Sequence, residues 1–130
     1  MAQSPISVTE LDHIVLVCDD VETTMEWYVD KLALEPLRVD EWRAGSVPFP
    51  SLRVAAETII DLFPASSSEA DNGRLDHYCL TIDPIDLDAV AASGMFDVVS
   101  GPATRWGARG DGRSLYVRDP EGVIVELRHY

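Results

Sequence analysis

The sequence repeats itself with a period of 64 to 65 residues, and this repeat limits the possible fold more than any other feature. LDHIVL at residues 11–16 returns as LDHYCL at residues 75–80, and IIDL at residues 59–62 returns as IVEL at residues 124–127. A fixed offset between matching segments indicates two copies of one structural unit. We interpret residues 11–64 and 75–130 as the two units, and the small, polar segment 65–74 as a linker.

The first unit is predicted to contain four strands and one helix. Apolar and β-branched residues at 11–18 indicate a buried strand. Asp19 and Glu22 resemble a capping box, and apolar residues then recur at helical spacing until Glu35-Pro36 ends the helix. Three further strands are expected at 37–43, 50–56 and 58–63.

The second unit is predicted to repeat this order. A strand at 75–82 leads to a helix that is entered through Asp83-Pro84 and closed by Gly94. Strands are expected at 96–100, 113–118 and 123–128, the last two joined by a turn at 119–122. Each unit is therefore βαβββ, and we expect an α+β fold in which the two tandem units form a cupped mixed sheet. A chain of 130 residues suits one such domain, residues 1–130.

Two histidines and two carboxylates occupy matching positions in the two units. His13 and His77 lie on the first strand of each unit, and Asp61 and Glu126 lie on the last strand. If the units pack about a pseudo-two-fold axis, these four side chains converge on one concave surface. Imidazole and carboxylate ligands suit Ni, Co, Zn, Mn or Fe(II), so the pattern predicts a divalent metal site. Asp61 is one methylene shorter than Glu126, which leaves open whether it reaches the ion.

Charge excludes two classes of partner. The chain has 23 acidic and 10 basic residues, a net charge of −13, which repels phosphate backbones and anionic lipid. We therefore expect no nucleic-acid and no membrane binding. There is no apolar run of roughly 20 residues and no signal-peptide pattern at the first residues, so we expect a cytoplasmic protein. Cys18 and Cys79 are too few for a disulfide framework and are expected to be free thiols.

A short arginine-rich stretch is a candidate substrate contact. Four of the nine arginines fall between residues 105 and 118, and Trp106 lies among them. Arg109, Arg113 and Trp106 are the candidate substrate residues, and the arginines could hold an anionic group of a substrate through bidentate contacts. The alternative is a solvated loop whose positive charges offset neighbouring acids.

The repeated βαβββ units, the strand histidines and the ending SLYVRDPEGVIVE at residues 114–126 resemble the vicinal oxygen chelate superfamily. This superfamily groups glyoxalase I, bleomycin- and fosfomycin-resistance proteins, extradiol dioxygenases and methylmalonyl-CoA epimerase. The resemblance covers residues 11–129 and is greatest to small glyoxalase domain-containing proteins, through the same ending and GARG at residues 107–110.

The resemblance implies metal ligands at His13, His77 and Glu126, with Asp61 where glyoxalase I has a glutamate. That difference leaves open a site with four protein ligands or a face of two histidines and one carboxylate. Tyr116 matches a tyrosine of the dioxygenase signature. The histidine that the same signature requires before residue 115 is missing, because residues 107–109 are Gly, Ala and Arg.

The implied function is that of a divalent-metal-dependent, glyoxalase I-like lyase or isomerase acting on a small substrate with vicinal oxygens through a metal-bound ene-diolate. Glu126 would be the catalytic base, or Asp61 if it stays off the metal. Tyr116 is the third candidate catalytic residue, with a hydroxyl that contacts either the substrate or a metal ligand. The alternatives are an extradiol-type ring-cleavage dioxygenase and a non-catalytic, bleomycin-resistance-like binding protein. Family members of this length also lead us to expect a homodimer.

Overall fold

The structure is a computed structural model that describes residues 4–67, 73–118 and 122–130. The first half contains β1 (Val8–Cys18), α1 (Val21–Leu32), β2 (Glu35–Leu37), α2 (Val39–Arg43), β3 (Ser51–Ala55) and β4 (Thr58–Pro64), followed by a short 3-10 turn (Ala65–Ser67). The second half contains β5 (Leu75–Ile82), α3 (Leu87–Ala92), β6 (Asp97–Gly107), β7 (Gly110–Arg118) and β8 (Ile124–His129).

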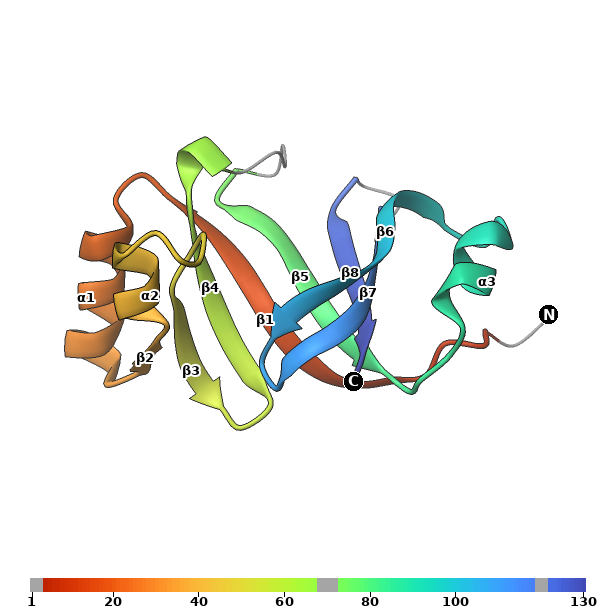
Figure 1. Ribbon diagram of the computed structural model, residues 1–130, viewed down its shortest axis with the longest axis horizontal. Coiled ribbons are helices and arrows are strands. Elements are labelled where there is room, and N and C mark those ends of the chain that lie inside the picture. Colours follow the sequence, from red (N-terminus) through yellow and green to blue (C-terminus); the bar gives the residue numbers. More distant parts are fainter. Residues whose placement is uncertain (1–3, 68–72, 119–121) are drawn as a thin grey trace.

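All eight strands form one mixed sheet in the order β2-β3-β4-β1-β5-β8-β7-β6. β1 and β5 pair antiparallel at its centre, while β1 pairs with β4 and β5 with β8 in parallel. Outward from the centre, the two halves therefore have the same strand order. The predicted α+β fold with two βαβββ units is confirmed, and Figure 1 shows α1 and α2 at one end of the sheet and α3 at the other.

Each half has its own apolar core between its helices and its strands. In the first half, Val21 and Met25 of α1 pack near Leu52 and Leu62. In the second, α3 packs against a cluster that includes Leu127. Side chains alternate along a strand, so the neighbours of Leu62 and Leu127 point to the opposite face, and these neighbours are the two predicted carboxylates. No helix within the described ranges is long and apolar enough to cross a membrane.

The predicted strand at 37–43 is wrong. Arg38 has a left-handed conformation with φ of 62°, which ends β2 at Leu37 and turns the chain into α2. Val39 and Trp42, three residues apart, both pack against the first core, which is helical spacing. Tertiary packing and the left-handed backbone of Arg38 therefore make this segment a helix and not a strand.

Both predicted helix starts need correction. Asp20, and not Asp19, caps α1, because its side chain accepts a hydrogen bond from the Thr23 N–H at 3.1 Å. The second helix does not begin at Pro84; Asp86 caps α3 by accepting from the Ala89 N–H at 3.2 Å. Polar side chains that satisfy free N–H groups thus set both helix starts.

The remaining predicted boundaries differ in detail. β6 and β7 are longer than predicted and form a hairpin that closes between residues 107 and 110. Gly94 follows the end of α3 with φ of 77°, as expected for a helix terminator. Most of the predicted turn at 119–122, and residues 68–72 of the predicted linker, lie outside the described residues.

Two glycines make room for a fully buried arginine. Arg128 on β8 is 0% exposed, and its guanidinium lies against Gly107 and Gly112. A Cβ atom on Gly107 would overlap that guanidinium and would lie 2.6 Å from Oδ2 of Asp12. A larger residue at position 107 would therefore require the side chains of Arg128 and Asp12 to shift.

We expect Gly107→Ala to lower the free energy of unfolding by about 1–3 kcal/mol, the usual cost of overpacking. Urea denaturation followed by circular dichroism measures this change. The matched control is the same substitution in an Arg128→Met background, where the penalty should shrink because the guanidinium is gone. An equal loss in both backgrounds would show that the arginine is not the cause.

Candidate metal centre

The three central strands β1, β5 and β8 bring His13, His77 and Glu126 together. In the sheet register, His13 is opposite Cys79, and Cys79 is opposite Glu126. The Nε2 atoms of both histidines lie 3.0 Å from the same atom, Oε1 of Glu126. The three possible ligand atoms all lie within 4.8 Å of one another. A single chain therefore supplies the whole cluster, with one histidine from each half.

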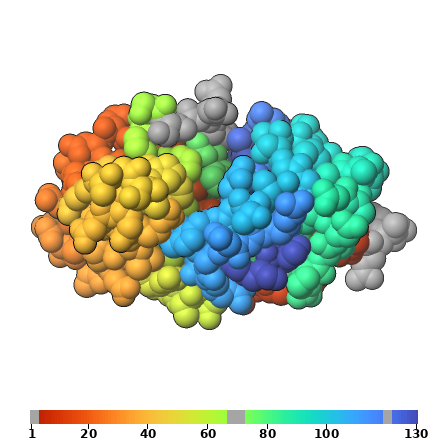
Figure 2. Space-filling model, viewed as in Figure 1, coloured from red at the N-terminus to blue at the C-terminus, as the bar shows by residue number. Residues whose placement is uncertain are grey.

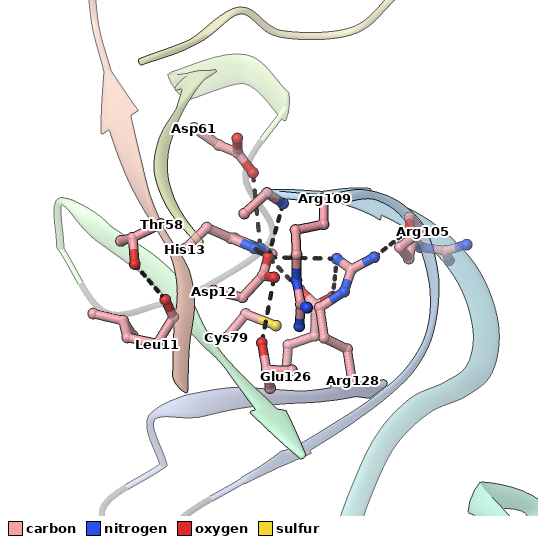
Figure 3. Close-up of polar contacts among 12 residues, drawn as sticks. Leu11, Asp12, His13, Thr58, Asp61, Cys79, Arg105, Arg109, Glu126 and Arg128 are labelled. Carbon is pink, nitrogen blue, oxygen red and sulfur yellow. Dashed lines mark hydrogen bonds and ion pairs between the residues drawn. The ribbon is translucent and has the colours of Figure 1, made fainter. Parts of the chain in front are cut away.

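The residue before each histidine fixes the orientation of its ring. Oδ2 of Asp12 lies 2.7 Å from Nδ1 of His13, and Oδ2 of Asp76 lies 2.6 Å from Nδ1 of His77. A carboxylate on one ring nitrogen leaves the other nitrogen for a metal ion and increases its basicity. These residues fit a divalent ion, because the Nε2 atoms of both histidines face the same carboxylate oxygen (Figure 3 shows the His13 side).

Glu126 is held by groups that leave Oε1 directed at the histidines. The Ser114 hydroxyl donates to Oε2 at 2.7 Å, and Nη1 of Arg128 donates to the same oxygen at 3.3 Å. Arg128 also lies 3.9 Å from Oδ2 of Asp12. One buried guanidinium thus balances part of the negative charge of the cluster, and Figure 3 shows it beside Asp12 and Glu126.

Asp61 lies on the same face but stands apart from the other three side chains. Its backbone is opposite Val15 on β1 and Ser51 on β3. Oδ1 accepts a 2.5 Å hydrogen bond from the Ser51 hydroxyl, and Oδ2 is 3.8 Å from Nε2 of His13. Asp61 is buried, at 2% exposure, yet it is not part of the group whose ligand atoms lie within 4.8 Å.

The electrostatics distinguish the two carboxylates. Burial alone would raise the pKa of Glu126, but hydrogen bonds and charge from His13 and His77 hold this pKa well below its usual value. For Asp61, burial dominates and raises the pKa to about 6. Burial would lower the pKa of each histidine, but the neighbouring aspartate and Glu126 raise it. Each imidazole therefore has a carboxylate on both sides, an aspartate at Nδ1 and Glu126 at Nε2.

The cluster lies in the wall of a cavity of about 570 Å³. Tyr116 is opposite Glu126 on the neighbouring strand, and its ring is 5.4 Å from the His77 ring. Burial raises the pKa of the Tyr116 hydroxyl, which keeps it protonated. The residues of the prediction that line this cavity are His13, Asp61, His77, Trp106, Tyr116 and Glu126.

Two predicted substrate contacts do not line this cavity. The Arg109 guanidinium lies over the Tyr130 ring at 4.4 Å and 3.7 Å from Glu10. Arg113 is directed toward α3, with Nη2 at 3.4 Å from Asp88. Arg105 and Arg118, the other two arginines of this stretch, do line the cavity, so clustering in sequence does not bring all four arginines to one site. Cys18 and Cys79 are free, buried thiols.

Sequence reasoning missed the groups that support the cluster. Asp12 and Asp76 had a visible signal, because the repeated LDH motif places an aspartate before each histidine. Ser51, Ser114 and Arg128 had no such signal, since their contacts depend on strand register and on the close approach of the hairpin.

An eight-stranded sheet of two βαβββ halves, with a cluster of two histidines and one carboxylate at its centre, defines the class of vicinal oxygen chelate folds. The chain belongs to the glyoxalase/bleomycin resistance protein/dioxygenase superfamily, whose family model matches residues 10–127. The superfamily contains many enzymes, among them glyoxalases, epimerases and dioxygenases.

Two related proteins are similar to this chain over nearly its whole length. The chain is 30% identical over 131 residues to a glyoxalase domain-containing protein of Mycosarcoma maydis, covering 98% of this chain and 72% of that protein. It is 27% identical over 124 residues to a virulence protein of Salmonella typhimurium, covering 95% of this chain and 85% of the relative.

Solved structures support the fold. The Mn(II)-bound glyoxalase of Novosphingobium aromaticivorans matches with a TM-score of 0.66 and 22% identity, covering 95% of this chain and 40% of that one. Methylmalonyl-CoA epimerase of Mycobacterium tuberculosis matches with a TM-score of 0.63 and 21% identity, covering 98% and 92%. At these identities the likeness establishes the architecture alone.

We expect Asp76→Asn to weaken Mn(II) binding by about 10- to 100-fold, the usual effect of removing a carboxylate behind a ligand histidine. Isothermal titration calorimetry measures the affinity. The control is Asp88→Asn, which removes an exposed carboxylate outside the cavity and should leave the affinity unchanged. Wild-type affinity in Asp76→Asn would contradict the supporting role of Asp76.

Proposed function

We propose that this protein is a divalent-metal-dependent lyase or isomerase that acts on a small molecule with two adjacent oxygens. The observation that carries this proposal is the convergence of His13, His77 and Glu126 in a cavity wall, with Asp61 nearby and outside the cluster. Family membership and the Mn(II)-bound glyoxalase among the structural neighbours support it.

His13, His77 and Glu126 would hold the ion, which could be Ni, Co, Zn, Mn or Fe(II). When bound, such an ion supplies positive charge that stabilises two adjacent substrate oxygens while a neighbouring C–H group loses its proton. Glu126 is suited to the ligand role, because its Oε1 atom lies 3.0 Å from Nε2 of both imidazoles. The cluster lies within one chain, while the predicted homodimer stays a prediction.

Asp61 is the better candidate for the catalytic base. Ser51 occupies Oδ1, so Oδ2 is left to take a proton from the substrate and to return it to the neighbouring carbon. The Tyr116 hydroxyl lines the same cavity and can donate a hydrogen bond to a substrate oxygen as negative charge develops there. We therefore assign the base to Asp61 and reserve Glu126 for the metal.

A second candidate function is an extradiol-type dioxygenase. Two histidines and one carboxylate, with Asp61 standing apart, form the ligand set of many Fe(II) oxygenases. The missing histidine at residues 107–109 still weighs against this candidate.

The test measures exchange of a substrate C–H proton for deuterium, catalysed by the Mn(II)-loaded protein in D₂O. The two substrates are hydroxyacetone and the hemithioacetal of methylglyoxal and glutathione, and NMR monitors the loss of the C–H signal. We expect Asp61→Asn to retain Mn(II) and to slow exchange by about 100-fold or more, the usual contribution of a general base. Glu126→Gln should lose both Mn(II) and exchange. Asp88→Asn is the matched control.

Three outcomes would contradict parts of the proposal. Exchange at the wild-type rate in Asp61→Asn would refute its role as base. Oxygen uptake on catechol by the Fe(II)-loaded protein, without exchange, would favour the dioxygenase. Failure to retain any divalent ion would favour a metal-free binding protein of the bleomycin-resistance kind.

A further inference from the structure

Arg38 lines the cavity and lies against two aromatic rings. It lies between β2 and α2 in the first half, with its guanidinium carbon 5.3 Å from the centre of the Phe49 ring and 4.0 Å from that of Trp106. Trp106 is on β6, in the second half. All three residues line the cavity that contains His13 and Glu126. Figure 2 shows the segment that follows Arg38 (gold) and the β6–β7 hairpin (blue) meeting on one face of the molecule.

The guanidinium lacks a partner for one of its nitrogens. Nη1 of Arg38 is buried and has no hydrogen-bond partner among the described residues. Burial lowers the pKa of Arg38, although charge from Asp61, Glu41 and Asp111 opposes this effect. A buried donor without an acceptor is unfavourable in a folded protein, and each such group calls for an explanation. An acceptor oxygen from a bound molecule would satisfy it.

The backbone at Arg38 is also unfavourable. Its φ of 62° lies in the left-handed region, which residues other than glycine rarely adopt. Backbone outliers of this kind cluster at ligand-binding sites, where the surrounding structure holds them. Here the turn directs the arginine side chain onto two aromatic rings that restrict its movement. The position of the guanidinium is thus fixed before any ligand arrives.

We propose that Arg38 binds an anionic group, a carboxylate or a phosphate, of the molecule whose adjacent oxygens reach His13, His77 and Glu126. This inference rests on the proposed function and narrows its substrate to a small acid. The planar guanidinium presents two parallel N–H donors, which match two oxygens of such a group. Arg105 and Arg118 line the same cavity, so three guanidinium groups face the three carboxylates of its wall, and an acidic ligand would meet a lining whose formal charges balance.

The first experiment uses metal-free protein, so that it does not depend on the metal proposal. Succinate and inorganic phosphate are titrated separately while the indole N–H signal of Trp106 is followed by NMR. We expect one of these anions to shift the signal in wild type, and Arg38→Gln to bind it about 10- to 100-fold more weakly, as for a lost charge-assisted hydrogen bond. The control is Arg113→Gln, which removes an arginine outside the cavity.

Arg38→Lys is the second variant. It keeps the charge and most of the side-chain length but lacks the planar fork, so its affinity for the same anion should fall by about 10-fold. Wild-type affinity in Arg38→Gln and Arg38→Lys would overturn the proposal. Absence of any shift with both anions in wild type would also overturn it.

The second experiment uses Mn(II)-loaded protein and two hydroxamates that chelate metal through adjacent oxygens. N-hydroxysuccinamate carries a carboxylate that acetohydroxamate lacks. Wild type should prefer the former by about 10-fold or more, and Arg38→Gln should lose only this preference. Equal binding of both by wild type would overturn the proposal. If neither hydroxamate binds, the metal proposal fails. The titration of metal-free protein with anions then tests by itself whether Arg38 binds an anionic group.

Discussion

The antiparallel pairing of β1 with β5 is the interaction on which the site depends. This pairing joins the two halves into one sheet and sets His13 opposite Cys79 and His77 opposite Val15. Because β8 then pairs with β5, Glu126 comes into line with the same residues. A shift of one residue in this register would turn one histidine to the helix-covered face. The cluster therefore exists only in one register of the central strands.

The two histidines and Glu126 are buried at the centre of the sheet, so they need further polar groups that hydrogen-bond to them. Asp12, Arg128 and Glu126 are each at most 1% exposed. The Tyr130 hydroxyl donates to Oδ1 of Asp12, and the Arg128 guanidinium lies 4.8 Å from the centre of the Tyr130 ring. Buried charges are tolerated where they are paired and hydrogen-bonded. This network fixes the orientation of the His13 ring. It also places glycines of the β6–β7 hairpin, Gly107 and Gly112, directly against the Arg128 guanidinium.

Much of the architecture could be predicted from the repeat, because matching segments imply matching strands. The joint position of His13, His77 and Glu126 followed from the same symmetry. The segment around Arg38 could not be predicted, because its left-handed backbone and the packing of Val39 and Trp42 are tertiary effects. Arg109 and Arg113 were predicted to contact the substrate because they are close in sequence to Trp106. Closeness in sequence does not show which way a side chain points, and these two contact Tyr130 and Asp88 instead.

The most direct test of the account is the metal content of protein loaded with Mn(II) and freed of excess ion, measured by elemental analysis. Since each half supplies one histidine, we predict about one ion per chain in wild type, and its loss in both His13→Ala and His77→Ala, because metal affinity depends on the full ligand set. A wild-type protein without metal, or either variant retaining the wild-type content, would contradict a metal centre shared by the two halves.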